Sequence, residues 1–149
     1  MTFPTLNRHQ VREKALQAIF QLKSNDELDI DTAIEMARLS DYEKQYDTHG
    51  WPEEPYLYRL VEGVLTNQDP INEKIRPYLK KWTLERLPRT DVIILQLAVF
   101  EMLFVDEADV PSRVALNEAI ELAKEYCDDS SRKFINGVLS NLMTHTENP

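Results

Sequence analysis

The sequence predicts an all-α domain of about seven helices, and three observations favour this fold class. Apolar residues recur at helical spacing through nearly the whole chain, and no stretch alternates convincingly with a period of two. Only three of the 149 residues are glycine, which disfavours a loop-rich β-sandwich or a glycine-rich nucleotide fold. The apolar run over residues 92–105 suits the central helix of a helical core. The length fits one domain, residues 1–149.

Three helices are expected in the first half of the chain. Residues 6–23 form one apolar stripe at helical spacing, and residues 29–46 repeat this pattern and can begin at Asp29 or Asp31. The simplest arrangement packs the second helix on the first. Residues 47–55, "DTHGWPEEP", contain a glycine and two prolines and predict a loop. Residues 56–67 then resume the helical pattern.

The second half predicts four more helices. One starts at Asp69 and Pro70 and should bend near Pro77. Residues 89–104 are apolar almost all round and form the expected core helix, with Thr90 or Asp91 as its N-cap. Two amphipathic helices follow, in residues 110–127 and 130–143, and Ser130 or Ser131 is the expected cap of the last. The most buried positions are expected to include Ile94, Leu97, Ala98 and Phe104.

Charge is unevenly distributed along this acidic chain. The formal net charge is −9, but residues 25–54 hold ten acids and two cations. Residues 73–89 instead hold six cations and two acids, and residues 1–14 hold three cations and one acid. Charges further apart than about 8 Å are heavily screened at physiological salt, so a local basic face still neutralises phosphates.

The sequence gives little support to catalysis or to metal binding. The three histidines have no metal-ligand spacing, and Cys127 has no cysteine partner. No phosphate-binding loop, nucleophile elbow or dinucleotide fingerprint is present. The N-terminus lacks a signal-peptide pattern, and the longest apolar run spans 14 residues, too few to cross a membrane. We therefore expect a cytoplasmic protein that is not an enzyme and needs no cofactor.

Two basic segments are candidate RNA contacts. Arg8 and Arg12 lie one turn apart in "RHQVREKALQAIF", and Lys133 precedes Phe134 in "SSRKFINGVL". Cations next to an aromatic ring suit unpaired RNA, which is held by phosphate contacts and base stacking. Each pattern is also typical of an ordinary helix flank with solvated cations. Phe134 is in register with Val138 and Leu142, so it belongs either to the core or to a stacking surface.

Four segments together resemble the NusB family of bacterial transcription antitermination factors. The stretch "ALNEAIELAKEYCDDSSRKFINGVLSNL" is similar to the C-terminal signature of that family. The segments "RHQVREKALQAIF", "IRPYLKKW" and "RTDVIILQLAVFEM" are similar to its first, middle and central helices, in the same order. The similarity covers most of the chain outside residues 24–55.

This resemblance implies a compact fold of two small helical bundles without catalysis. It implies binding of boxA-type single-stranded RNA of ribosomal-RNA leader transcripts, together with NusE, a small-subunit ribosomal protein, in an RNA polymerase antitermination complex. The implied RNA-binding residues are Arg8, Arg12, Arg113, Lys133 and Phe134. The implied partner-binding residues are Phe20, Tyr78 and Asp91.

The sequence departs from the family pattern in two places. The N-terminal arginine cluster is thin, and Ser130 stands where many members have an acid. The alternative function is a helical protein-interaction module with little RNA binding of its own. NusB-like domains also occur fused to RNA methyltransferase domains, but these 149 residues leave no room for such a domain, so we do not expect catalysis by this chain itself. The sequence does not determine the oligomeric state.

Overall fold

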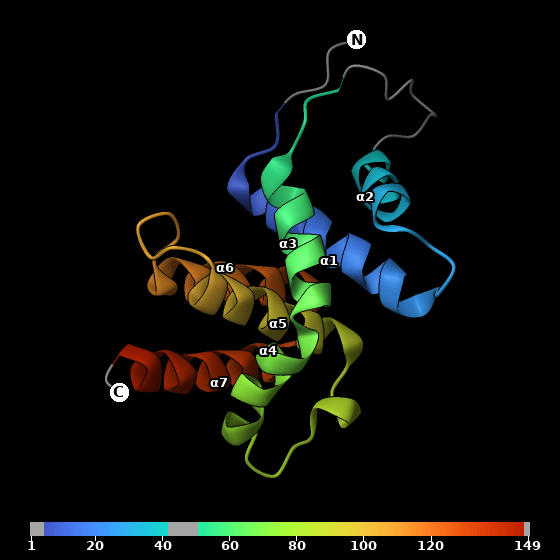
Figure 1. Cartoon of the computed structure of the whole chain (residues 1–149). Coiled ribbons are helices and arrows are strands. Elements are labelled where there is room, and N and C mark those ends of the chain that lie inside the picture. The colour runs from blue at the N-terminus through green and yellow to red at the C-terminus, as the bar shows by residue number, and fades with distance from the viewer. Residues whose placement is uncertain (1–4, 42–50, 148–149) are drawn as a thin grey trace. The chain divides into compact units, whose positions relative to one another are not determined.

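The computed structural model describes residues 5–41 and 51–147, and across these residues it contains seven α-helices, two short 3₁₀ helices and no strand (Figure 1). The all-α prediction is confirmed. The chain divides into two compact units, Met1–Leu65 and Thr66–Pro149. The first holds α1 (Arg8–Ser24), α2 (Ile30–Leu39) and nearly all of α3 (Pro55–Thr66). The second holds α4 (Gln68–Ile75), the 3₁₀ helices η1 (Arg76–Tyr78) and η2 (Leu84–Arg86), α5 (Arg89–Phe104), α6 (Ser112–Tyr126) and α7 (Asp129–Glu147).

In the first unit, α2 packs on α1 as the sequence predicts. A capping box opens α1: the Asn7 side chain accepts from the Gln10 backbone, and the Gln10 side chain accepts from the Asn7 backbone. Asp29 caps α2 by accepting from the Thr32 backbone N–H at 2.7 Å. Val11, Ala15, Leu16 and Ile19 of the first apolar stripe are buried. The predicted loop is non-helical over residues 51–54, and its residues 47–50 lie outside the described part of the chain.

An ion pair between a buried lysine and an exposed aspartate links the two helices of this first unit. Lys14 is only 1% exposed, and its Nζ lies 2.7 Å from a carboxylate oxygen of Asp41, just beyond the end of α2. The same ammonium donates to the side chains of Gln17 and Ser40, each at 3.3 Å. These three partners match the three donors of a lysine ammonium, so its burial leaves no donor unmet.

The second unit is built around α5, which contacts α4, α6 and α7 (Figure 1). Its residues 93–101 are all buried, as a central helix requires. Burial includes Gln96, whose amide donates to Asn72 on α4 at 2.8 Å. Ile94, Leu97 and Ala98 are buried as predicted.

The prediction for Phe104 is wrong, because this side chain is 41% exposed. It lies in the last turn of α5, where the neighbouring helices no longer cover it, and it stacks on Phe100 with the ring centroids 5.5 Å apart. The predicted cap of α5 is also wrong. Pro88 is the N-cap and makes no side-chain cap bond, while Thr90 and Asp91 lie inside the first turn.

The segment around Pro77 changes helix type as its proline predicts. The α-helix begins at Gln68, one residue before Asp69, and ends at Ile75. Residues 76–78 continue as a 3₁₀ turn with Pro77 in it. This change of direction brings the chain out of the helical core and into the loop that forms one wall of the site described next.

Candidate nucleic-acid interface

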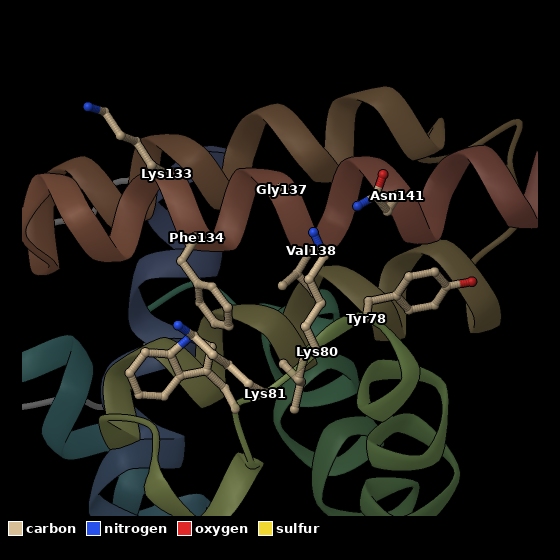
Figure 2. Close-up of a pocket in the computed structure, with 10 residues that line it drawn as sticks. Tyr78, Lys80, Lys81, Lys133, Phe134, Gly137, Val138 and Asn141 are labelled. Atoms are coloured by element: carbon tan, nitrogen blue, oxygen red, sulfur yellow. The ribbon is translucent and has the colours of Figure 1, made fainter.

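A pocket of about 300 Å³ lies in the second unit between α7 and the loop that follows η1 (Figure 2). Its lining combines aromatic and aliphatic side chains with three lysines, and it contains no acidic residue. The lining residues are Tyr78, Leu79, Lys80, Lys81, Trp82, Lys133, Phe134, Gly137, Val138 and Asn141. The fold thus brings Tyr78 together with Lys133 and Phe134, although the resemblance assigns them to different partners.

Phe134 is partly exposed and forms one side of this pocket. Its ring meets the indole of Trp82 edge to face, with the centroids 6.3 Å apart and an interplanar angle of 68°. Ile135, Val138 and Leu139 face the core and are buried. Phe134 is therefore neither fully core nor fully free to stack. Figure 2 shows that it extends from α7 toward the loop, whereas Lys133 points away from it.

The loop wall owes its shape to an unusual backbone at Lys80. Lys80 has φ of 58°, the left-handed region that L-residues other than asparagine and aspartate seldom adopt. Leu79 and Leu84 anchor the loop on either side and are 1% and 5% exposed. Between these anchors Trp82 is 51% exposed, so about half of a large aromatic side chain faces solvent.

The start of α7 differs from its prediction. Asp128 is the capping residue, since its carboxylate accepts from the Ser131 backbone N–H at 2.8 Å. Neither Ser130 nor Ser131 caps the helix, and both cap predictions are wrong. Asp129 pairs with Arg132 at 3.3 Å. The two aspartates thus neutralise much of the helix N-terminus and engage Arg132, while Lys133 makes no ion pair in the described part of the chain.

Asp91, one of the implied partner-binding residues, is buried. It is 3% exposed, and the thiol of Cys127 donates to its Oδ1 at 3.2 Å. Burial raises the pKa of Cys127 to about 12, and the hydrogen bond to the negatively charged Asp91 adds to this rise. Cys127 is therefore protonated and unreactive at neutral pH.

In the first unit, Arg8 is exposed at the start of α1 and stacks on Tyr56 of α3. Its guanidinium carbon lies 3.8 Å from the ring centroid. Tyr56 contacts the flat face of the guanidinium, so the N–H groups in the plane of the guanidinium can still donate hydrogen bonds to a ligand. Nearby, buried Glu54 accepts from the Leu6 backbone N–H at 2.9 Å and fixes the chain that leads into α1.

The other residues that the resemblance singles out differ in exposure. Arg12 is only 3% exposed, whereas Arg113 is exposed in the first turn of α6. Phe20 is 37% exposed on α1. Burial leaves Arg12 and Asp91 little surface for direct contact with a partner.

Sequence patterns did not single out Tyr56, Lys80, Lys81 or Trp82 as members of these sites. Lys80, Lys81 and Trp82 belong to "IRPYLKKW", a segment that the family resemblance already marks. Two lysines followed by a tryptophan are the sequence feature that could have predicted this site. No such feature marks Tyr56, because a tyrosine at the start of an amphipathic helix is common.

Comparison with known proteins identifies the family. The model of the NusB family matches residues 9–144, and the chain belongs to this family. The transcription antitermination protein NusB of Enterococcus faecalis is 48% identical over 145 residues, covering 96% of this chain and 93% of that protein. The protein of the same name from Lactiplantibacillus plantarum is 45% identical, covering 97% and 99%. Membership places the chain among transcription antitermination factors and not among enzymes.

Solved structures agree with this assignment. The structure of T. maritima NusB is 32% identical and superposes with a TM-score of 0.76, covering 97% of this chain and 93% of that one. A complex of the antitermination factors NusB and NusE with double-stranded RNA contains a chain that is 22% identical, with a TM-score of 0.72 and coverage of 93% and 96%, and it supports the fold. Within the described residues, none of the helices is long and apolar enough to span a membrane.

Proposed function

We propose that this chain binds boxA-type RNA of ribosomal-RNA leader transcripts together with NusE, as part of an RNA polymerase antitermination complex in the cytoplasm. The observation that supports the proposal lies at the start of α7, where Lys133, an exposed cation without an ion pair among the described residues, is followed in sequence by the partly exposed ring of Phe134. One supplies a phosphate contact and the other an aromatic edge for a base.

Two further features support RNA binding. Arg8 is exposed and oriented by Tyr56 at 3.8 Å, a geometry that suits a phosphate contact. Arg113 is exposed at the start of α6 and is a lesser candidate. Arg12 is buried and is a weaker candidate than the sequence pattern suggests. A solved complex of NusB and NusE with double-stranded RNA contains a chain of the same fold, which supports an RNA partner.

For NusE binding, exposure separates the three candidate residues. Phe20 is exposed and Tyr78 is half-buried, and both offer apolar contact area. Asp91 is buried against Cys127, so its substitution acts first on the fold. Phe20 and Tyr78 are therefore the better choices for a partner-binding experiment.

The test is a titration of fluorescently labelled boxA-type RNA at two salt concentrations, with and without NusE. We expect Lys133→Ala to weaken binding almost uniformly across RNA sequences and to reduce the salt slope by about one. Lys74→Ala is the matched control, since Lys74 is exposed on α4 of the same unit and lies outside the pocket.

Folding of both variants is checked by thermal unfolding, and we expect changes within about 0.5 kcal/mol. Unaltered affinity and salt slope in Lys133→Ala, with NusE present, would show that Lys133 is an ordinary solvated lysine that does not contact RNA. No RNA binding by the unmodified chain with NusE present would favour the alternative, a protein-interaction module, which the net charge of −9 makes a reasonable second candidate.

A further inference from the structure

We propose that a groove on the first unit docks a short segment of another protein that carries lysine or arginine side chains next to an apolar residue. The groove lies between the end of α1, the turn that leads into α2, and α3, and its volume is about 650 Å³. We call it the acidic groove, because its lining includes Asp26, Asp29, Asp31 and Glu62. This inference goes beyond the proposed function and does not depend on RNA binding.

Apolar side chains from all three helices line the acidic groove and are only partly covered by the protein itself. Leu22, Leu28, Ile30 and Leu65 are each partly exposed, and Tyr58 is 38% exposed. A single exposed leucine is ordinary, but several apolar side chains around one concavity are typical of a site that a partner covers. The volume lies within the usual range for binding pockets and is sufficient for a large apolar side chain of a partner.

The charge of the lining determines which partner fits the acidic groove. Four carboxylates accompany the apolar side chains, and the lining contains no lysine, arginine or histidine. RNA does not suit this surface, because the carboxylates would repel its phosphates. Lysine and arginine side chains complement the charge, and such complementarity selects partners and speeds their association. The occupant that fits both features is therefore a cationic protein segment with an apolar side chain.

Two of the four carboxylates are held in place by the fold. Asp29 caps α2 by accepting from the Thr32 backbone N–H at 2.7 Å, and its hydrogen bonds with Thr32 lower the pKa of Asp29. Asp31 accepts a hydrogen bond from the Tyr58 hydroxyl, and burial followed by the charge of Asp31 raises the pKa of Tyr58. Asp29 therefore keeps its negative charge at neutral pH, and Asp31 is oriented by α3. Acids that are already oriented lose less conformational entropy when a partner binds.

The arrangement of the carboxylates favours a peptide over a metal ion. All four acids belong to the described part of the chain, and no three of them lie close enough together to share one ion. Carboxylates that are spread around a groove instead suit separate cationic side chains, each of which contributes a small amount to binding.

The test is a titration of a short fluorescein-labelled peptide, built of lysine and leucine, with the full-length chain, followed by anisotropy. We expect saturable binding that weakens as the salt concentration rises. A peptide with glutamate in place of every lysine should not bind, because its charge is repelled. A peptide with serine in place of every leucine should bind more weakly, because it lacks the apolar contact.

Charge reversal on the protein tests whether the peptide binds in the acidic groove. Asp26 is exposed in the turn before α2, and Glu62 is exposed on α3. Asp26→Lys and Glu62→Lys should each weaken peptide binding between about two-fold and about ten-fold. Glu27→Lys is the matched control, since Glu27 is exposed in the same turn and lies outside the lining. Thermal unfolding checks that all three variants fold.

Backbone amide chemical shifts provide a second readout that needs no variant. On addition of the peptide we expect the largest changes at Asn25, Leu28 and Leu65, which line the acidic groove. Changes gathered on the second unit would overturn the proposal.

Three further results would also overturn it. Equal peptide affinity in Asp26→Lys, Glu62→Lys and Glu27→Lys would show that the peptide follows the net charge of the chain. Displacement of the peptide by calcium chloride, but not by sodium chloride of the same ionic strength, would assign the carboxylates to a metal ion. A dimer in light scattering that Asp26→Lys dissociates and Glu27→Lys does not would assign the acidic groove to a second copy of the chain. Absence of RNA binding by the unmodified chain would remove the proposed function and leave this inference intact.

Discussion

Three charged side chains of this protein are more buried than their sequence patterns suggest. Lys14, Arg12 and Asp91 lie on helices at positions where charge usually faces solvent, yet each is at most 3% exposed. For Lys14 and Asp91 the compensating contacts are visible: an ion pair with Asp41 at 2.7 Å, and the Cys127 thiol at 3.2 Å. Such contacts join distant residues, so spacing alone does not reveal them.

The Asp91 and Cys127 contact makes a testable prediction about thiol reactivity. The pKa of Cys127 is raised to about 12, first by burial and then by Asp91. Asp91→Asn removes the negative charge and should lower that pKa toward its usual range, because the thiolate is then repelled less. We expect faster alkylation by iodoacetamide near pH 9 than in the unmodified chain. The readout is the rate, followed by mass spectrometry.

The raised pKa of Cys127 also predicts how the stability of the fold depends on pH. The folded state holds the thiol proton more tightly than the unfolded state. The contribution of Cys127 to the free energy of unfolding is therefore complete below about pH 9 and is lost as pH rises toward 12.

The control for the alkylation test is Glu121→Gln, which removes an acid from the exposed side of α6. An equal alkylation rate in Asp91→Asn and this control would show that the carboxylate does not influence the thiol.

At the scale of elements, Gly137 allows the sharpest prediction about stability. Alanine is favoured over glycine in a helix interior, and the added methyl group meets no neighbour within 4 Å. Gly137→Ala should therefore raise the free energy of unfolding by about 0.5 to 1 kcal/mol. Chemical denaturation with urea measures this change. A loss of stability would mean that this part of α7 is more crowded than the structure indicates.

Helical periodicity predicted the elements well and their ends poorly. The stripe in α1, the core helix α5 and the break at Pro77 follow from local sequence, since a helix needs only local bonds and one apolar face. The cap at Asp128 was missed because serines and aspartates occur side by side before α7. Phe104 was misplaced because burial in a last turn depends on where neighbouring helices end.

The candidate site was predictable only in part for a related reason. Lys133 and Phe134 are adjacent in sequence, so their pairing was visible. Trp82 meets Phe134 from 52 positions earlier in the chain, and the contact depends on the left-handed turn at Lys80. A single positive φ of this kind has no reliable signature in a lysine.

At the scale of the whole molecule, each compact unit presents an exposed cation that suits a phosphate: Arg8 in the first and Lys133 in the second. If one RNA molecule contacts both units, the contributions of Arg8 and Lys133 to the free energy of RNA binding should be additive. We expect Arg8→Ala and Lys133→Ala each to reduce the salt slope of RNA binding by about one, and the double variant to reduce it by about two. The losses in binding free energy should likewise add within about 0.5 kcal/mol.

The measurement is RNA affinity by anisotropy at four or more salt concentrations, with NusE present and Lys74→Ala as the control. Arg8 also stacks on Tyr56, so Arg8→Lys tests whether the charge or the planar guanidinium matters. This variant should keep the salt slope and lose affinity, because an ammonium retains the charge without the oriented donors. A double variant no weaker than Lys133→Ala alone would confine the RNA to the second unit, and the charge at the start of α1 would then have a structural role only.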